Sequence, residues 1–123
     1  MLGFSILFII NVSFSFGFLD VYELQYSKGL EAYRNNQFAL SIQEFELILE
    51  KGWVSDELYY NLGNAYYRSG NISGAIWSYE SCLKIKPSHS DAKYNLKLAN
   101  LRVKDRVDFP EAPFYLKFYI NIK

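Results

Sequence analysis

A period of 34 residues is the feature that most constrains the fold of this chain. When residues 22–55 are placed over residues 56–89 without a gap, nine positions are identical. These pairs are Glu23/Glu57, Leu24/Leu58, Tyr26/Tyr60, Gly29/Gly63, Tyr33/Tyr67, Arg34/Arg68, Ile42/Ile76, Glu46/Glu80 and Leu49/Leu83. A period of this length is typical of stacked supersecondary units, in which each copy buries the hydrophobic face of the next.

Each unit is predicted to contain two helices. In the second copy, Ser55 can cap a helix whose first turn carries negative charge, which the helix dipole favours. Residues that recur every three or four positions form the apolar face of this helix, namely Tyr59, Leu62, Gly63 and Tyr66. The sequence "SGN" at 69–71 predicts a break, after which Asn71 or Ser73 caps a second helix. That helix presents Ala75, Ile76, Tyr79, Cys82 and Leu83, and Pro87 ends it.

A glycine in the middle of each first helix requires an explanation. Glycine inside a helix costs about 1 kcal/mol relative to alanine. The cost is tolerable where a second helix crosses closely, so we expect Gly63 to face the small residue Ala75. Gly29 opposite Ser41 would repeat this arrangement in the first copy.

The spacing of these residues resembles the tetratricopeptide repeat (TPR) consensus. The matching residues are Leu62, Gly63, Tyr66, Gly70, Ala75, Tyr79 and Pro87. The first copy departs from the consensus, because Lys28, Ala32 and Asn36 replace the leucine, the tyrosine and the second glycine. The resemblance implies an all-α solenoid of helical hairpins, and it leaves the partner open because repeats of this kind serve many functions.

The pattern returns once more over residues 90–105 and then stops. Tyr94, Asn95 and Leu96 repeat Tyr60, Asn61 and Leu62, with a helix start expected at Ser90 and Asp91. Pro110 and Pro113 lie where a further helix would have its middle, and proline there costs about 3 kcal/mol. We therefore predict a TPR domain over 18–105, with repeats 22–55 and 56–89 and a closing helix 90–105. The tail, 106–123, is interrupted by proline and then apolar.

The N-terminal residues predict a targeting segment rather than part of the folded domain. Residues 1–18 contain no charged side chain, and small residues alternate near Ser15 and Gly17, where a signal peptidase would cut. We expect 1–17 to be a signal peptide, or an uncleaved membrane anchor at the short limit for a spanning helix. We expect the protein to be exported, and to be either periplasmic or anchored in the cytoplasmic membrane.

A narrower resemblance combines this leader with the repeats. The leader, a degenerate repeat ending in "LEKGWVS" and then "YYNLGNAYYRSGNISGAIWSYESCLKIKP" are similar to the aerotolerance-operon (BatE-like) TPR proteins of bacteria. The resemblance implies a role in stress or oxygen tolerance in the cell envelope. It also implies protein partners that include von Willebrand-type proteins of the same operon.

Composition argues against catalysis and against nucleic acid. Thirteen basic residues balance thirteen acidic ones, which removes the usual electrostatic attraction to phosphate backbones. A single cysteine and a single histidine exclude a Cys/His zinc site. We expect Cys82 to be a small buried thiol and His89 to be a solvated loop residue. No cofactor and no metal are expected, and the chain is predicted not to be an enzyme.

The first helices carry the candidate binding residues. Offsets of three, seven and eleven residues keep one helical face. In TPR proteins this face lines the concave groove that holds a partner peptide, so the resemblance assigns the groove to Tyr26, Leu30, Arg34, Tyr60, Asn61, Asn64, Arg68, Tyr94, Asn95, Leu98 and Arg102. Arginine binds carboxylate, asparagine pairs with peptide backbone, and tyrosine adds contact area. These groups suit an extended acidic or C-terminal peptide.

Two functional hypotheses follow. In the first, the chain is a peptide-binding scaffold that helps assemble a membrane-associated complex. In the second, it is a structural fragment that associates with itself or packs on membrane segments, since each arginine also lies near a helix C-terminus, where positive charge is favoured. A chaperone-type carboxylate clamp is disfavoured, because Tyr26, Asp91 and Asn95 occupy its basic positions and only Asn61 fits.

Overall fold

Helices account for nearly all of the chain that the structure describes. The computed structural model describes residue 17 and residues 21–104. The first helix covers residues 21–34, and it is followed by α2 (Phe38–Glu50), α3 (Asp56–Ser69), α4 (Ile72–Ile85) and α5 (Ser90–Lys104). No strand occurs within this described part. The predicted all-α arrangement of two helical pairs and one closing helix is confirmed.

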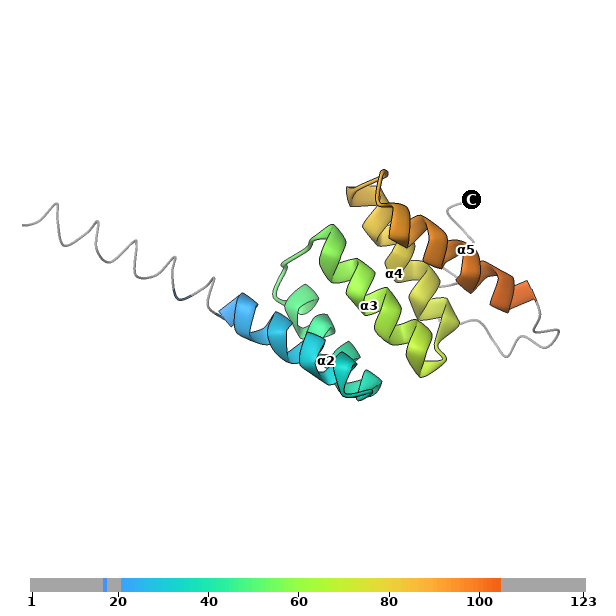
Figure 1. Ribbon diagram of the computed structural model, residues 1–123. Helices are drawn as coiled ribbons and strands as arrows, with labels where there is room; N and C mark the ends of the chain where they lie inside the picture. Colours follow the sequence, from blue (N-terminus) through green and yellow to red (C-terminus); the bar gives the residue numbers. More distant parts are fainter. Residues whose placement is uncertain (1–16, 18–20, 105–123) are drawn as a thin grey trace, which may run out of the picture.

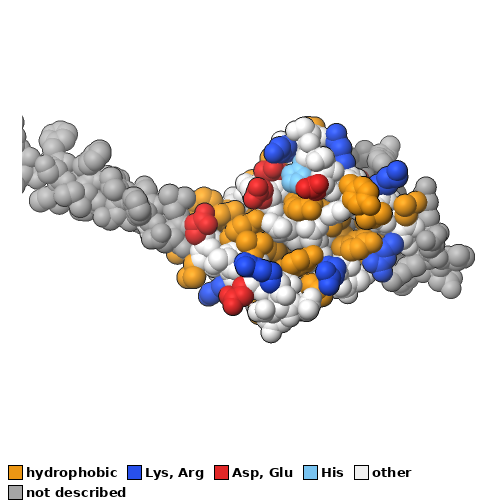
Figure 2. Space-filling view, in the orientation of Figure 1, with side chains coloured by type: hydrophobic (Ala, Val, Ile, Leu, Met, Phe, Trp, Pro, Cys, Tyr) orange, Lys and Arg blue, Asp and Glu red, His pale blue; other side chains and the backbone are white. Residues whose placement is uncertain are grey.

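The helices form two layers. The first helix, α3 and α5 lie on the side that faces the viewer in Figure 1, and α2 and α4 lie behind them. In sequence order, α2 packs on α3, α3 on α4, and α4 on α5. The side formed by the first helix, α3 and α5 is called the groove face below. Hydrophobic side chains gather across its middle, with charged side chains around them (Figure 2).

Local chemistry sets most helix ends as the sequence predicts. The Ser55 hydroxyl accepts a hydrogen bond from the Leu58 N–H at 3.0 Å, and Asn71 Oδ1 accepts one from the Gly74 N–H at 2.9 Å. Gly70 ends α3 with a φ of 89°, a left-handed conformation that glycine adopts at little cost. Asn36 occupies the equivalent turn in the first pair with a φ of 59°. Asparagine is among the residues that tolerate this conformation, so the turn survives without glycine.

The start of α5 confirms one prediction and corrects another. The helix begins at Ser90, with Asp91 in its first turn, as expected, but His89 is not a solvated loop residue. The His89 Nδ1 atom accepts a hydrogen bond from the Ala92 N–H at 3.2 Å, while its ring lies 4.8 Å from the ring of Tyr60. An imidazole nitrogen can replace the usual cap oxygen because it offers the same lone pair to the free N–H groups of the first turn.

The glycines of the first helices do allow close crossing, but aromatic rings fill the space. A methyl group on Gly63 would lie 2.6 Å from the Tyr79 ring, and one on Gly29 would lie 2.5 Å from the Phe45 ring. The expected contact of Gly63 with Ala75 is therefore corrected to a contact with Tyr79. Ser41 does meet Gly29 as expected, since its hydroxyl donates to the Gly29 carbonyl at 2.9 Å.

Two hydrophobic clusters hold the layers together. Phe45 and Ile48 of α2 pack with Leu58 and Leu62 of α3. The second cluster joins α4 to α5 through Tyr79, Cys82, Ala92 and Ala99, all at most 1% exposed. The prediction that Cys82 is a buried thiol is confirmed.

The predictions for the two ends of the chain concern residues that the structure, apart from residue 17, does not describe. The leader 1–17 is described only at residue 17, and the tail 106–123, with Pro110 and Pro113, is not described. Among the described residues, none of the helices has both the length and the apolar character needed to cross a bilayer.

Candidate protein-interaction groove

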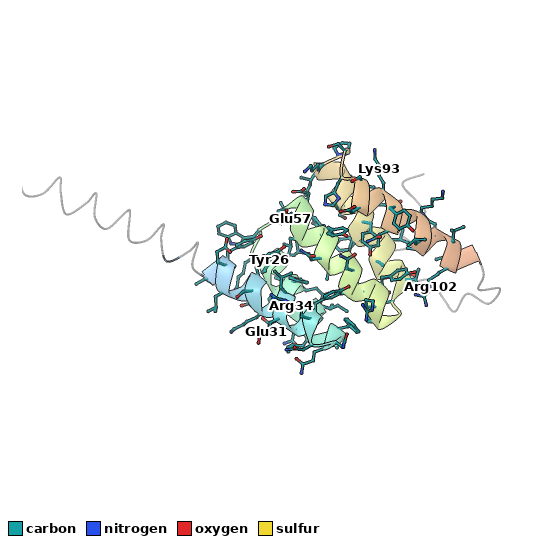
Figure 3. The ribbon with its side chains drawn as sticks, viewed as in Figure 1. Tyr26, Glu31, Arg34, Glu57, Lys93 and Arg102 are labelled. Carbon is teal, nitrogen blue, oxygen red and sulfur yellow. The ribbon has the colours of Figure 1, made fainter. Side chains whose placement is uncertain are left out.

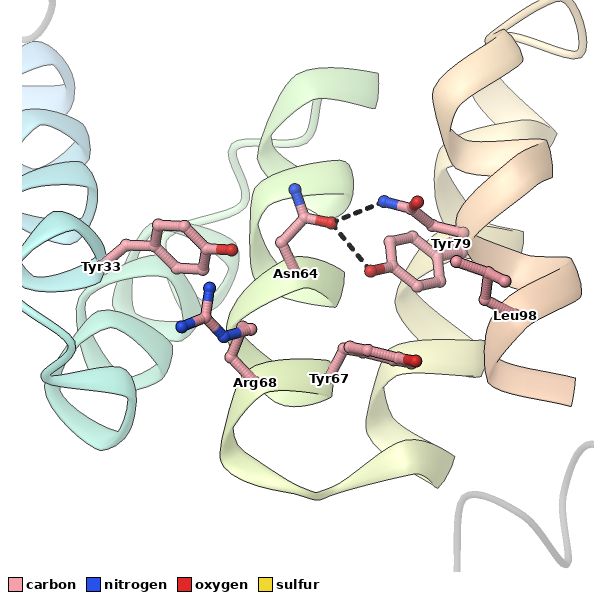
Figure 4. Close-up of a pocket in the computed structure, with 7 residues that line it drawn as sticks. Tyr33, Asn64, Tyr67, Arg68, Tyr79 and Leu98 are labelled. Carbon is pink, nitrogen blue, oxygen red and sulfur yellow. Dashed lines mark hydrogen bonds between the residues drawn. The ribbon is translucent and has the colours of Figure 1, made fainter. Parts of the chain in front are cut away.

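A pocket of about 120 Å³ opens on the groove face. Its walls come from four helices, and its lining residues are Tyr33, Asn64, Tyr67, Arg68, Tyr79, Asn95 and Leu98 (Figure 4). Pockets that hold drug-sized molecules are usually about 300–1,000 Å³. The volume here suits one side chain of a ligand that extends beyond the pocket.

The repeat period explains why these residues meet. Tyr33 and Tyr67 are equivalent positions of successive units, as are Asn64 and Leu98. Stacking the units brings such positions side by side on one face. The pocket therefore crosses all three first helices of the stack, with Tyr79 contributed from α4 behind them.

A hydrogen-bond network fixes the two carboxamides of the pocket. The Oδ1 atom of Asn64 accepts from the Tyr79 hydroxyl at 2.8 Å and from Asn95 Nδ2 at 3.0 Å (Figure 4). Asn95 Nδ2 also donates to the Tyr60 hydroxyl at 3.5 Å. Burial raises the pKa of Tyr79 well above its usual value, so its hydroxyl keeps the proton that it donates.

The network leaves one donor group and one acceptor free. Within the part of the chain that is described, no hydrogen bond involves Asn64 Nδ2 or Asn95 Oδ1. Both atoms belong to residues that line the pocket. A carbonyl and an N–H of an extended backbone are the complementary groups.

Arg68 adds positive charge to the pocket. Its guanidinium lies 4.8 Å from the centre of the Phe38 ring, a cation–π arrangement that holds the group in place. Among the described side chains, no carboxylate forms a salt bridge with Arg68. No acidic residue lines the pocket either. The charge of Arg68 is thus available to a ligand.

The other two predicted arginines lie outside the pocket lining. Arg102 stacks over the Tyr67 ring at 4.9 Å, and Arg34 donates from Nε to the Leu30 carbonyl at 3.4 Å. Both are exposed on the groove face (Figure 3). Two of the three arginines of the predicted column therefore lie over aromatic rings, and Arg68 alone among the three lines the pocket.

The tyrosine column mainly joins successive units. Asn61 Nδ2 donates to the Tyr26 hydroxyl at 2.6 Å, and Asn95 makes the same contact with Tyr60, in both cases across 35 positions. Tyr26 also packs on Phe45 at 5.7 Å between ring centres. Tyr94, the next in the column, is 63% exposed.

Four of the predicted groove residues meet at the pocket, namely Asn64, Arg68, Asn95 and Leu98. The remaining seven, Tyr26, Leu30, Arg34, Tyr60, Asn61, Tyr94 and Arg102, do not line it. Sequence reasoning missed Tyr33, Tyr67 and Tyr79. The signal for two of them was present, because Tyr33 and Tyr67 are identical across the period and directly precede the paired arginines.

The pocket offers recognition groups and little reactive chemistry. Cys82 is fully buried, and desolvation raises the pKa of its thiol to about 11, so the nucleophilic thiolate is scarce near neutral pH. Within the described residues, no cluster of three His, Cys, Asp or Glu side chains is placed to bind a metal ion. What the lining supplies is hydrogen bonding, aromatic surface and one cation.

Comparison with known proteins agrees with this geometry. Residues 56–89 match the family model described as tetratricopeptide repeat. The chain is 34% identical over 82 residues to a peroxisomal targeting signal receptor of Kluyveromyces lactis, covering 66% of this chain and 14% of the relative. The corresponding receptor of Saccharomyces cerevisiae is 35% identical over 95 residues, covering 76% and 15%. The chain thus spans a small part of the length of each relative.

The family match and the helical layers identify the same unit. The matched range contains α3, α4 and the turn at Gly70. Residues 56–89 are therefore a tetratricopeptide repeat, set within an all-α helical repeat solenoid.

Proposed function

We propose that this chain is a non-enzymatic protein-interaction scaffold that binds an extended peptide segment on its groove face. The observation that carries the proposal is the pocket that crosses three successive first helices. It combines a free donor on Asn64, a free acceptor on Asn95 and the unpaired charge of Arg68. The relatives support it, since their name describes receptors for a targeting signal.

The preferred ligand is a peptide that carries a carboxylate, either an acidic side chain or a C-terminus. Arg68 is exposed, and its stacking on Phe38 leaves the edge of the guanidinium free for a bidentate contact. The tyrosines of the pocket supply flat apolar walls for one neighbouring side chain. A hydrogen bond to a charged group contributes about 1.5–3 kcal/mol.

The setting we propose is the bacterial cell envelope. The uncharged leader and the similarity to aerotolerance-operon (BatE-like) proteins support an exported or membrane-anchored form. In this setting the scaffold helps to assemble a membrane-associated complex in stress or aerotolerance, with von Willebrand-type operon proteins as partners. Contact with the membrane is through the N-terminus or the tail.

A structural role is the second candidate. The hydroxyls of Tyr26 and Tyr60 are engaged in bonds between units, and Arg102 stacks on a neighbouring ring. These contacts favour a fragment whose groove face stabilises the stack, and which associates with itself or with membrane segments.

Arg68→Gln separates the two candidates. Binding to the full chain is measured by fluorescence anisotropy, using labelled peptides with a free or an amidated C-terminal carboxyl group. We expect the variant to lose about tenfold or more in affinity for the acidic, free-carboxyl peptides. Arg34→Gln is the matched control, since Arg34 holds the equivalent position one unit earlier and lies outside the pocket. Equal losses in both variants, or no binding at all, would contradict the proposal.

A further inference from the structure

The Phe38 ring fixes two side chains of the pocket at the junction between the first and second units. Phe38 is the first residue of α2. The Tyr33 ring, from the first helix, lies 5.5 Å from the Phe38 ring between centroids, in an edge arrangement. The Arg68 guanidinium, from α3, lies 4.8 Å from the centre of the same ring. Tyr33 and Arg68 are therefore held beside one another although they come from different units.

The Tyr33 hydroxyl is available to a ligand. Its side chain is half-buried and lines the pocket with Arg68. Figure 4 shows the hydroxyl and the guanidinium turned toward the same space. Among the residues that the structure describes, none forms a hydrogen bond with this hydroxyl. A guanidinium carries only N–H donors and a phenol carries one O–H donor, so the two side chains together offer donors to one acceptor group.

The second junction of the stack is built differently. Its equivalent residues, one unit later, are Tyr67, Ile72 and Arg102. Ile72 has no aromatic ring, and Arg102 lies over the Tyr67 ring itself at 4.9 Å, outside the pocket lining. Figure 4 shows the Tyr67 hydroxyl pointing away from Arg68. A phenol hydroxyl and a guanidinium thus share the pocket only at the first junction.

A carboxylate is the acceptor that fits these two donors. Its two oxygens can each accept one hydrogen bond, and hydrogen bonds to an ionised acceptor are shorter and stronger than neutral ones. The pocket holds about 120 Å³ and contains one charged residue, the cation Arg68. One cation balances the single charge of a carboxylate, whereas a phosphate group would bring a charge of about −1.5 to −2.

We propose that Tyr33 is a second carboxylate-binding residue of the groove. Its hydroxyl donates to one oxygen of the ligand's carboxylate while Arg68 donates to the other, and Phe38 positions both side chains. The inference rests on the proposed function and adds to it a residue that selects for the acid. The carboxylate is thereby bound at the junction of the first two units, and not at the second junction.

Tyr33→Phe tests this inference, because it removes the hydroxyl and keeps the ring that packs on Phe38. The matched control is Tyr67→Phe, since Tyr67 holds the equivalent position one unit later and also lines the pocket. A library of short labelled peptides is first screened against the full chain for a binder. The binder is then made with a free and with an amidated C-terminal carboxyl group, and its affinity is measured by fluorescence anisotropy.

We expect Tyr33→Phe to lose about tenfold in affinity for the free-carboxyl peptide and less than about twofold for the amidated one. The amidated peptide also reports whether the groove of the variant remains folded. Tyr67→Phe should change either affinity by less than about twofold. Adding Tyr33→Phe to Arg68→Gln should cause little further loss, because the two donors act on one carboxylate.

Two results would overturn the inference and leave the proposed function standing. One is a free-carboxyl peptide that depends on Arg68 but binds equally well to Tyr33→Phe. The other is a similar loss in Tyr33→Phe and Tyr67→Phe, or a similar loss for both forms of the peptide, which would assign the hydroxyl to the shape of the groove. A library without any binder would overturn the proposed function, and this inference with it.

Discussion

The side chain of Gly63 is a single hydrogen atom, and its small size allows α3 and α4 to pack closely. The Tyr79 ring lies where a side chain at position 63 would begin, and Tyr79 is 1% exposed with its hydroxyl held by Asn64. The ring therefore has little freedom to move away. Phe45 and Gly29 repeat the contact in the first unit.

Replacing Gly63 by alanine tests this contact. The change gains about 1 kcal/mol of helix propensity, but overpacking a tight core costs about 1–3 kcal/mol. Because the ring is fixed, we expect a net loss of about 1 kcal/mol or more in the free energy of unfolding, measured by urea denaturation. Lys97→Ala, at the equivalent exposed position of α5, should change stability by less than about 0.5 kcal/mol. A stabilised Gly63→Ala protein would show that the helices can separate freely.

Alkaline pH should destabilise the fold through Cys82. The unfolded thiol ionises near its ordinary pKa of 9.0, whereas the folded thiol keeps its proton until about pH 11. Between these values the unfolded chain binds fewer protons, so the free energy of unfolding falls as pH rises. Urea denaturation at a series of pH values measures the slope.

Cys82→Ala is the control for the pH effect. Without the thiol, the decline that starts near pH 9 should be shallower. Some decline should remain at higher pH, because burial also raises the pKa of Tyr26, Tyr59 and Tyr79. An identical slope in the two proteins up to pH 10 would exclude Cys82 as the source.

At the scale of the helix, the positions of the helix ends were easier to predict than the contacts between helices. Ser55, Asn71 and Gly70 act through bonds and backbone angles within a few residues, so local sequence was sufficient. The capping role of His89 was not predicted, because a histidine between two serines is usually read as a loop residue. Its contact with the Tyr60 ring depends on tertiary packing. The same limit applies to the pocket. Its Tyr79 comes from α4, and periodicity alone does not predict how close this side chain lies to the groove face.

The closing helix α5 is predicted to be essential for stability. Its Ala92 and Ala99 are fully buried against the cluster that contains Tyr79 and Cys82, with Ile76 and Leu83 at its edge. Exposing a large apolar side chain costs about 1.5–3 kcal/mol. Ending the chain at His89 should therefore lower the melting temperature by more than about 10 °C, as followed by circular dichroism. The comparison is a chain that ends at Lys104, and equal melting curves for the two would refute the role of α5.

For the whole molecule, the stack predicts an order of local opening. The middle unit, α3 with α4, packs on α2 at one side and on α5 at the other. Tyr26 and Tyr60 add one bond to each junction, from Asn61 and Asn95. A unit with neighbours on both sides opens only when two interfaces are broken, whereas a helix at the end of the stack opens when one interface is broken. Amide hydrogen exchange should therefore be slowest in α3 and α4 and faster in the first helix. Uniform protection from residue 21 to residue 104 would instead indicate that the units unfold only together.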